Sequence, residues 1–157
     1  AIFHLPRNKK FSLQFMASLV LSILLFGLII FGIQKSTNNA SYQLIKIEEL
    51  IKEKNYEAVI TRATDALDNP SSYKAQLLFQ RSFAYIELNK QELAIDDLEN
   101  SVQLHKEFPE AYFNLAILYS SQGASKKAEE AVKIAYQLKP QNEDYIKLYE
   151  QIMGERP

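Results

Sequence analysis

Cysteine is absent from the 157 residues of this chain, and histidine and glycine are scarce. Without cysteine there are no disulfide bonds and no thiolate metal ligands, although this absence does not identify the compartment. The two histidines, His4 and His105, lie far apart, and no group of His, Asp and Glu has the spacing of a metal site. None of the four glycines belongs to a phosphate-binding loop. We therefore expect no enzyme activity, no metal or other cofactor and no small-molecule substrate.

Negative charge is missing from the first part of the chain. Residues 1–36 carry four basic residues and no acidic one, whereas the remainder is acidic enough to bring the net charge to −1. Binding to nucleic acid requires a basic face, so the acidic remainder predicts a protein that does not bind nucleic acid. The acidic pairs at 96–97 and 129–130 are expected on solvated helix faces.

Residues 11–34, FSLQFMASLVLSILLFGLIIFGIQ, contain no charged side chain. As a helix rising ~1.5 Å per residue, this segment would extend roughly 36 Å, which exceeds the ~30 Å hydrocarbon core of a bilayer. A cleaved signal peptide is the alternative, but its apolar stretch usually has about 7–15 residues and ends at a small-residue site. The pattern favours a transmembrane helix at 11–34 in contact with lipid, preceded by a basic flank at 1–10 and followed by a short linker at 35–40.

The charges beside this segment predict its orientation. Arg7, Lys9 and Lys10 precede it, and Lys35 alone follows it directly. The side richer in Lys and Arg usually stays in the cytoplasm or its topological equivalent. We expect the N-terminus on that side and the rest of the chain in the periplasm, a lumen or an intermembrane space.

The rest of the chain repeats itself. Residues 75–104 align without a gap with residues 109–138, at an offset of 34 residues. Each copy has the apolar periodicity of two helices joined by a short polar turn. Gly123 suits the left-handed residue that ends a first helix, and Pro140 cannot continue a second helix.

With this unit the chain resembles the tetratricopeptide repeat (TPR) family, whose unit is 34 residues of helix–turn–helix. In the middle copy, Arg81, Ser82 and Lys106 depart from the family pattern. The resemblance implies that small residues at the pattern positions let the two helices approach closely. The matching residues of the last copy are Tyr112, Leu115, Ala116, Tyr119, Ala128, Val132, Ala135 and Pro140.

A weaker copy precedes these two, with Val59, Ala63 and Ala66 at the pattern positions and one residue inserted near 69–73. After the last copy, residues 143–153 have one apolar stripe, as expected of a helix that caps a stack. The predicted fold is all-α: one transmembrane helix followed by a TPR-like solenoid over 41–157, with repeats at about 41–74, 75–108 and 109–142 and a capping helix at 143–153.

The first helices of the repeats carry a second apolar face. The resemblance implies that first helices line the concave side of a right-handed superhelix, where this second face would form a groove. Leu44 and Ile51 would extend the row. Two interpretations stay open: neighbouring helices shade these side chains, or the strip binds an apolar or amphipathic segment of a partner. The candidate partner-binding residues are Phe79, Phe83, Ile86, Phe113, Asn114 and Ile117.

Some members of the family bind the acidic C-termini of heat-shock chaperones through a clamp of Lys, Asn, Asn, Lys and Arg. The corresponding residues here are Leu44, Glu48, Gln80, Glu110 and Asn114. Only Asn114 suits such a clamp, and the two glutamates would repel a carboxylate. We therefore do not expect a chaperone tail to be the ligand.

Together, the apolar segment and the resemblance predict a membrane-anchored protein-interaction module. It would act as a scaffold or assembly factor for a membrane-associated complex, with partners that are membrane proteins or lie at the membrane. In this respect the chain is similar to anchored periplasmic repeat proteins of bacterial secretion machinery and to anchored repeat proteins that help assemble photosystem I. The alternatives are a constitutive structural subunit of a large membrane complex and, from another class, a peripheral catalytic subunit.

Overall fold

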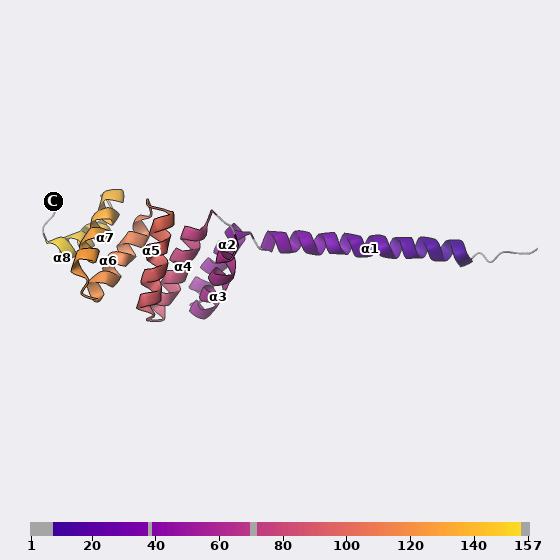
Figure 1. The fold of residues 1–157 in the computed structure, drawn as a ribbon, viewed down its shortest axis with the longest axis horizontal. Helices are drawn as coiled ribbons and strands as arrows, with labels where there is room; N and C mark the ends of the chain where they lie inside the picture. Colours follow the sequence, from indigo (N-terminus) through magenta and orange to yellow (C-terminus); the bar gives the residue numbers. More distant parts are fainter. Residues whose placement is uncertain (1–7, 38, 70–71, 155–157) are drawn as a thin grey trace, which may run out of the picture. The chain divides into compact units, whose positions relative to one another are not determined.

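The computed structural model describes residues 8–37, 39–69 and 72–154, and every regular element in these ranges is an α-helix (Figure 1). The chain divides into two compact units at Asn39 and Ala40. The first contains the single helix α1, and the second contains helices α2 to α8. The predicted all-helical fold is confirmed for these residues.

Helix α1 (Asn8–Thr37) contains the whole predicted span of 11–34. It continues through Lys35, Ser36 and Thr37, which were expected in the linker, because none of these residues is a proline or glycine that would end a helix. Outside the helices, Asn39 is the one described residue of the predicted linker. Residues 1–7 of the predicted basic flank lie outside the described residues.

The central part of α1 has the length and composition of a membrane span. The segment Phe15–Gly32 has a mean hydropathy of 2.6 and no buried residue. Its large apolar side chains are exposed on all sides, from Phe15 to Phe31. The Ser22 hydroxyl donates to the Ser18 carbonyl at 2.9 Å, so this polar group is satisfied within the helix. A signal sequence near the N-terminus can also be long and apolar enough to meet this description, so these properties do not by themselves establish a membrane span.

The second unit consists of three helix pairs and one final helix, which follow one another in chain order (Figure 1). Each helix packs against the next one along the chain, and α2 also contacts α4. Pro70, where the second helix of the first repeat was expected to end, lies outside the described residues. The pairs are α2 (Ala40–Lys52) with α3 (Tyr56–Leu67), α4 (Lys74–Glu87) with α5 (Gln91–Leu104), and α6 (Pro109–Ser121) with α7 (Ser125–Leu138); α8 (Glu143–Met153) follows.

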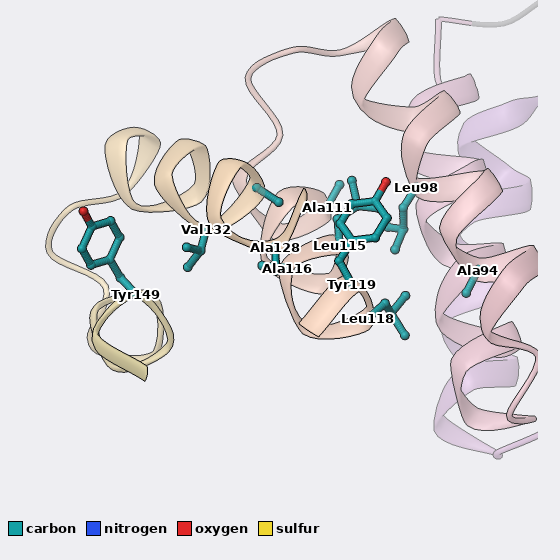
Figure 2. Packing of buried hydrophobic residues seen from close by; sticks show 11 residues of the cluster. Ala94, Leu98, Ala111, Leu115, Ala116, Leu118, Tyr119, Ala128, Val132 and Tyr149 are labelled. Carbon is teal, nitrogen blue, oxygen red and sulfur yellow. The ribbon is translucent and has the colours of Figure 1, made fainter. Parts of the chain in front are cut away.

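Small side chains fill the positions where the helices approach most closely. Ala128 and Ala135 of α7 are buried, as the register of the last repeat requires. One buried cluster joins α5, α6, α7 and α8, with Leu98, Leu115 and Val132 among its members (Figure 2). A second cluster joins α2, α3 and α4. Because each cluster takes residues from more than one helix pair, neighbouring repeats are held together by burial of apolar surface.

The three turns within the pairs share one backbone geometry. Gly123 has a φ of 72°, and the residues at the same place in the earlier repeats, Lys54 and Asn89, both have a φ of 57°. In each turn the following amide donates back to a carbonyl five residues earlier, as in the 2.9 Å bond from Ala124 N to Tyr119 O. This is the Schellman arrangement that ends an α-helix on a left-handed residue. The turn predicted at Gly123 therefore occurs in all three repeats, although only the last one uses glycine.

Arg81, which departs from the family pattern, makes a buried ion pair with Asp97. Its Nε and Nη2 atoms donate to the two carboxylate oxygens, each at 2.7 Å, and its Nη1 donates to Thr64 Oγ1 at 2.8 Å. The Asp97 side chain is only 2% exposed. The prediction that residues 96–97 lie on a solvated face is therefore wrong for Asp97, because an arginine from α4 covers it.

Burial of the Asp97 carboxylate costs free energy of solvation, and its hydrogen bonds with Arg81 offset part of that cost. Burial raises the pKa of the Asp97 carboxyl, and the hydrogen bonds from Arg81 act in the opposite direction. The two-pronged geometry satisfies both carboxylate oxygens. In the last repeat the same two positions are Leu115 and Ala131. The middle repeat therefore has an ion pair at these two positions, and the last repeat has two apolar side chains.

We predict that Arg81→Leu destabilises the repeat unit by about 3–5 kcal/mol, because it leaves the Asp97 carboxylate buried without its partner. The double variant Arg81→Leu/Asp97→Ala copies the last repeat and should recover most of this loss. Urea unfolding of the full chain in detergent, followed by helical circular dichroism, measures both values. A double variant as unstable as the single one would contradict the role given to the ion pair.

Candidate partner-binding surface

The six predicted strip residues come from two first helices, α4 and α6. The structure does not place them equivalently. Phe79 and Ile86 are half-buried and pack against the cluster that joins α5 to α8. Phe83, Phe113 and Asn114 are half-buried but are not among the residues of either cluster, and Ile117 is 42% exposed. The accessible part of the strip is therefore Phe83, Phe113, Asn114 and Ile117.

Each phenylalanine of the strip contacts an aromatic ring of another element. The centroids of Phe79 and Phe108 are 4.8 Å apart, and Phe113 stacks on Tyr145 of α8 at 4.7 Å. Phe83 meets Tyr56 of α3 edge to face at 6.2 Å. Such pairs stabilise the packing of neighbouring elements beyond the area they bury. The rings thus have a structural contribution, and each leaves part of its surface uncovered.

The first repeat has an exposed apolar residue on its first helix that the sequence analysis missed. Leu44 and Ile51, which were expected to extend the row, are half-buried against the cluster of the first repeat. Ile45 is instead 56% exposed. Ile45 has the same position in its repeat as Gln80 and Asn114 have in theirs. Alignment of the three repeats could therefore have identified it as a candidate surface residue.

The carboxylates near the strip are partly neutralised by neighbours. Glu110 accepts a hydrogen bond from Lys139 of α7. Although burial acts in the opposite direction, this bond lowers the pKa of the Glu110 carboxyl. Burial, with the Glu110 and Asp144 carboxylates nearby, raises the pKa of Tyr145 to about 12. Beside the strip, Tyr145 therefore keeps its phenol proton, and the charge of Glu110 is paired with that of Lys139.

The residues at the clamp positions do not form a cationic site. Glu48 is exposed, Glu110 is paired with Lys139, and Asn114 is half-buried. Within residues 8–37, 39–69 and 72–154 no group of three or more His, Cys, Asp or Glu side chains is arranged to hold a metal ion. The arrangement suits contacts to apolar and uncharged groups rather than to a terminal carboxylate.

Two family models match the chain. Residues 109–142 match the tetratricopeptide repeat, and residues 84–123 match a TPR repeat model. The chain therefore contains TPR repeats within residues 84–142, as the resemblance indicated, and its second unit has the fold of a TPR solenoid.

Solved structures share this fold at low sequence identity. The first TPR domain of Spaghetti (RPAP3), bound to the HSP90 peptide SRMEEVD, has a TM-score of 0.68 and 22% identity over 74% of this chain and 91% of that one. PilF of Pseudomonas aeruginosa has a TM-score of 0.69 and 18% identity over 74% of this chain and 53% of that one. These likenesses establish the fold.

One curated protein is similar in sequence. The rhomboid protease GluP of Bacillus subtilis is 28% identical over 119 residues, which cover 74% of this chain. The chain spans about a quarter of that protein's length, since the match covers 23% of it.

We predict different effects of Phe79→Ala and Ile117→Ala on stability. Phe79 packs against the buried cluster, so its truncation should cost about 2–4 kcal/mol, near the lower part of the range for core phenylalanines. Ile117 is exposed, so its truncation should cost no more than about 0.5 kcal/mol. Urea unfolding of both variants tests this difference. Equal losses would mean that Ile117 is part of the packed core and not of an accessible surface.

Proposed function

We propose that this chain is a membrane-anchored TPR scaffold that holds or assembles a membrane-associated protein complex. In this proposal α1 is a retained transmembrane helix in contact with lipid, and the partner lies at the strip of Phe83, Phe113, Asn114 and Ile117. The chain carries out no catalysis, takes no cofactor and binds neither nucleic acid nor a small-molecule substrate.

The observation that carries the proposal is the direct succession of an apolar helix and a repeat solenoid. Only residues 38 and 39 separate the end of α1 from the start of α2. A helix that is apolar on all sides is typical of a membrane span. A solenoid tethered by so short a connection works close to the membrane surface, so its partner is itself a membrane protein or lies at that surface.

The chemistry of the strip supports an apolar or amphipathic partner segment. An exposed isoleucine beside half-buried phenylalanine rings resembles the anchoring surfaces that take an apolar helix face. The first and the second TPR domains of RPAP3 are each solved with a chaperone peptide that ends in EEVD. The carboxylates of Glu48 and Glu110 argue against a similar acidic tail here. A constitutive structural subunit of a large complex is the second candidate, and the exposed apolar surface of α1 supports it equally.

The expected partner contact is tested by photocrosslinking in native membranes. A benzoylphenylalanine at position 117 should give a discrete crosslinked product with a membrane protein, and the same group at Lys133, exposed on the second helix α7, should not. Phe83→Ala should reduce the yield from position 117, because a buried ring at an interface contributes about 2 kcal/mol or more.

Equal products from positions 117 and 133, or a yield unchanged by Phe83→Ala, would show that the strip is not the contact. Recovery of the chain after detergent extraction distinguishes the two candidates. A fixed stoichiometry with one complex identifies a structural subunit, and substoichiometric recovery identifies an assembly factor.

The proposed orientation follows from Arg7, Lys9 and Lys10 before the apolar segment and Lys35 after it. Because the chain has no cysteine, single-cysteine variants report on sidedness without background. A membrane-impermeant maleimide added to intact cells, or to sealed vesicles of the same orientation, should modify Lys133→Cys at once. It should modify Asn8→Cys only after permeabilisation. The reverse pattern would place the repeats in the cytoplasm.

A further inference from the structure

A cavity of about 290 Å³ opens beside α6, between residues of α5 and α7. None of the six strip residues lines it, so it is distinct from the proposed partner-binding surface. Its floor includes Leu115 and Tyr119, which lie one turn apart on the same side of α6 (Figure 2). Ala131 of α7 lines it as well, and the carboxylates of Glu99 and Glu130 belong to its wall.

The repeat register shows what fills the same space one repeat earlier. Leu115 and Ala131 take the places of Arg81 and Asp97, and Tyr119 takes the place of Tyr85. In that earlier gap the Arg81 guanidinium lies 5.9 Å from the Tyr85 ring centroid and is bonded to Asp97 and Thr64. The space between two repeats of this chain therefore accommodates an arginine side chain on a tyrosine ring.

The later gap keeps the tyrosine but lacks both the arginine and the carboxylate of Asp97, and its carboxylates come from other positions. Glu99 occupies the place of Thr64 and accepts a hydrogen bond from the Tyr119 hydroxyl. Burial and this bond raise the pKa of Tyr119 well above its usual range, so the hydroxyl remains a donor. The exposed Glu130 carboxylate has no hydrogen-bond or ion-pair partner in the described part of the chain. A tyrosine ring and two carboxylates thus surround an open space.

Lys127 lies at the edge of this space and marks it as a cation site. Its Nζ is 4.9 Å from the Tyr119 ring centroid and 3.3 Å from Glu99 Oε1. The Lys127 side chain is 63% exposed, so it can move into solvent when another cation enters. An exposed ion pair of this kind contributes little stability, and displacing it costs correspondingly little.

We propose that this cavity receives an arginine side chain of a partner protein, which stacks on Tyr119 and pairs with Glu99 and Glu130 as Arg81 occupies the preceding gap. A guanidinium suits the site better than an ammonium, because its planar group stacks on an aromatic ring while its donors reach two carboxylates. An apolar side chain would leave the Glu130 carboxylate without a partner.

The full chain in lipid nanodiscs, labelled at alanine and isoleucine methyl groups, allows a direct binding test. The probe is Nα-acetyl-arginine amide, and the control probe is Nα-acetyl-citrulline amide, which has a similar planar end group without the charge. Arginine amide should shift the methyl signals of Ala131 and Ile134 saturably at millimolar concentration and leave Ala63, in the first repeat, unchanged. Citrulline amide should bind at least about fivefold more weakly.

Variants connect the binding to named groups. Glu130→Gln should weaken binding of arginine amide by about two- to fivefold, whereas Glu129→Gln, next to it but outside the cavity lining, should not. Lys127→Met should strengthen binding, because it removes the competing cation. Leu115→Arg/Ala131→Asp transplants the side chains of the preceding gap and should abolish binding by filling the space.

Several results would overturn the proposal: no saturable shift at Ala131, equal binding of the two probes, or tighter binding of Nα-acetyl-leucine amide. Circular dichroism checks that the transplanted double variant is folded. If it is not, Glu130→Gln and Lys127→Met still decide, since both replace exposed side chains. Unchanged affinity in both of these variants would exclude the carboxylate-lined cavity as the binding site.

Discussion

Close approach of helices through small buried side chains is the constraint on which this solenoid depends. Ala63, Ala94 and Ala128 occupy the contacts of second helices and have almost no exposed surface. A larger side chain at such a position would push the two helices apart and shift every later repeat, because each helix packs mainly on its neighbours in the chain. These contacts determine how the helices stack, and the stacking determines which side chains of the first helices remain exposed.

Departures from the repeat pattern have local compensation in this chain. Arg81 stands where the last repeat has Leu115, and the buried Asp97 stands where that repeat has Ala131. Lys54 and Asn89 adopt the left-handed conformation that Gly123 adopts without strain. Each departure is tolerated because the backbone geometry of the repeat is determined by burial of apolar surface and by the Schellman turns, which do not require one particular side chain.

The same repetition creates two surfaces of different chemistry. The strip on α4 and α6 combines half-buried rings with the exposed Ile117, and its rings also join neighbouring elements. The cavity beside α6 combines a tyrosine ring with two carboxylates. The first surface suits an apolar segment and the second suits a cation, so a partner that presents both could be held at two places.

The sequence by itself determined the features that depend on local periodicity. The 34-residue offset, the left-handed turn at Gly123 and the uncharged run at 11–34 were sufficient to predict the TPR repeats and an apolar helix, since helix periodicity and turn residues act over a few positions. Only the tertiary structure decided which of the apolar residues remain accessible. Phe79 and Ile117 recur on the same face, yet one packs against the buried cluster and the other is exposed, because a neighbouring repeat covers the first. The burial of Asp97 also depended on an arginine 16 residues away on another helix, and no local pattern reports such a contact.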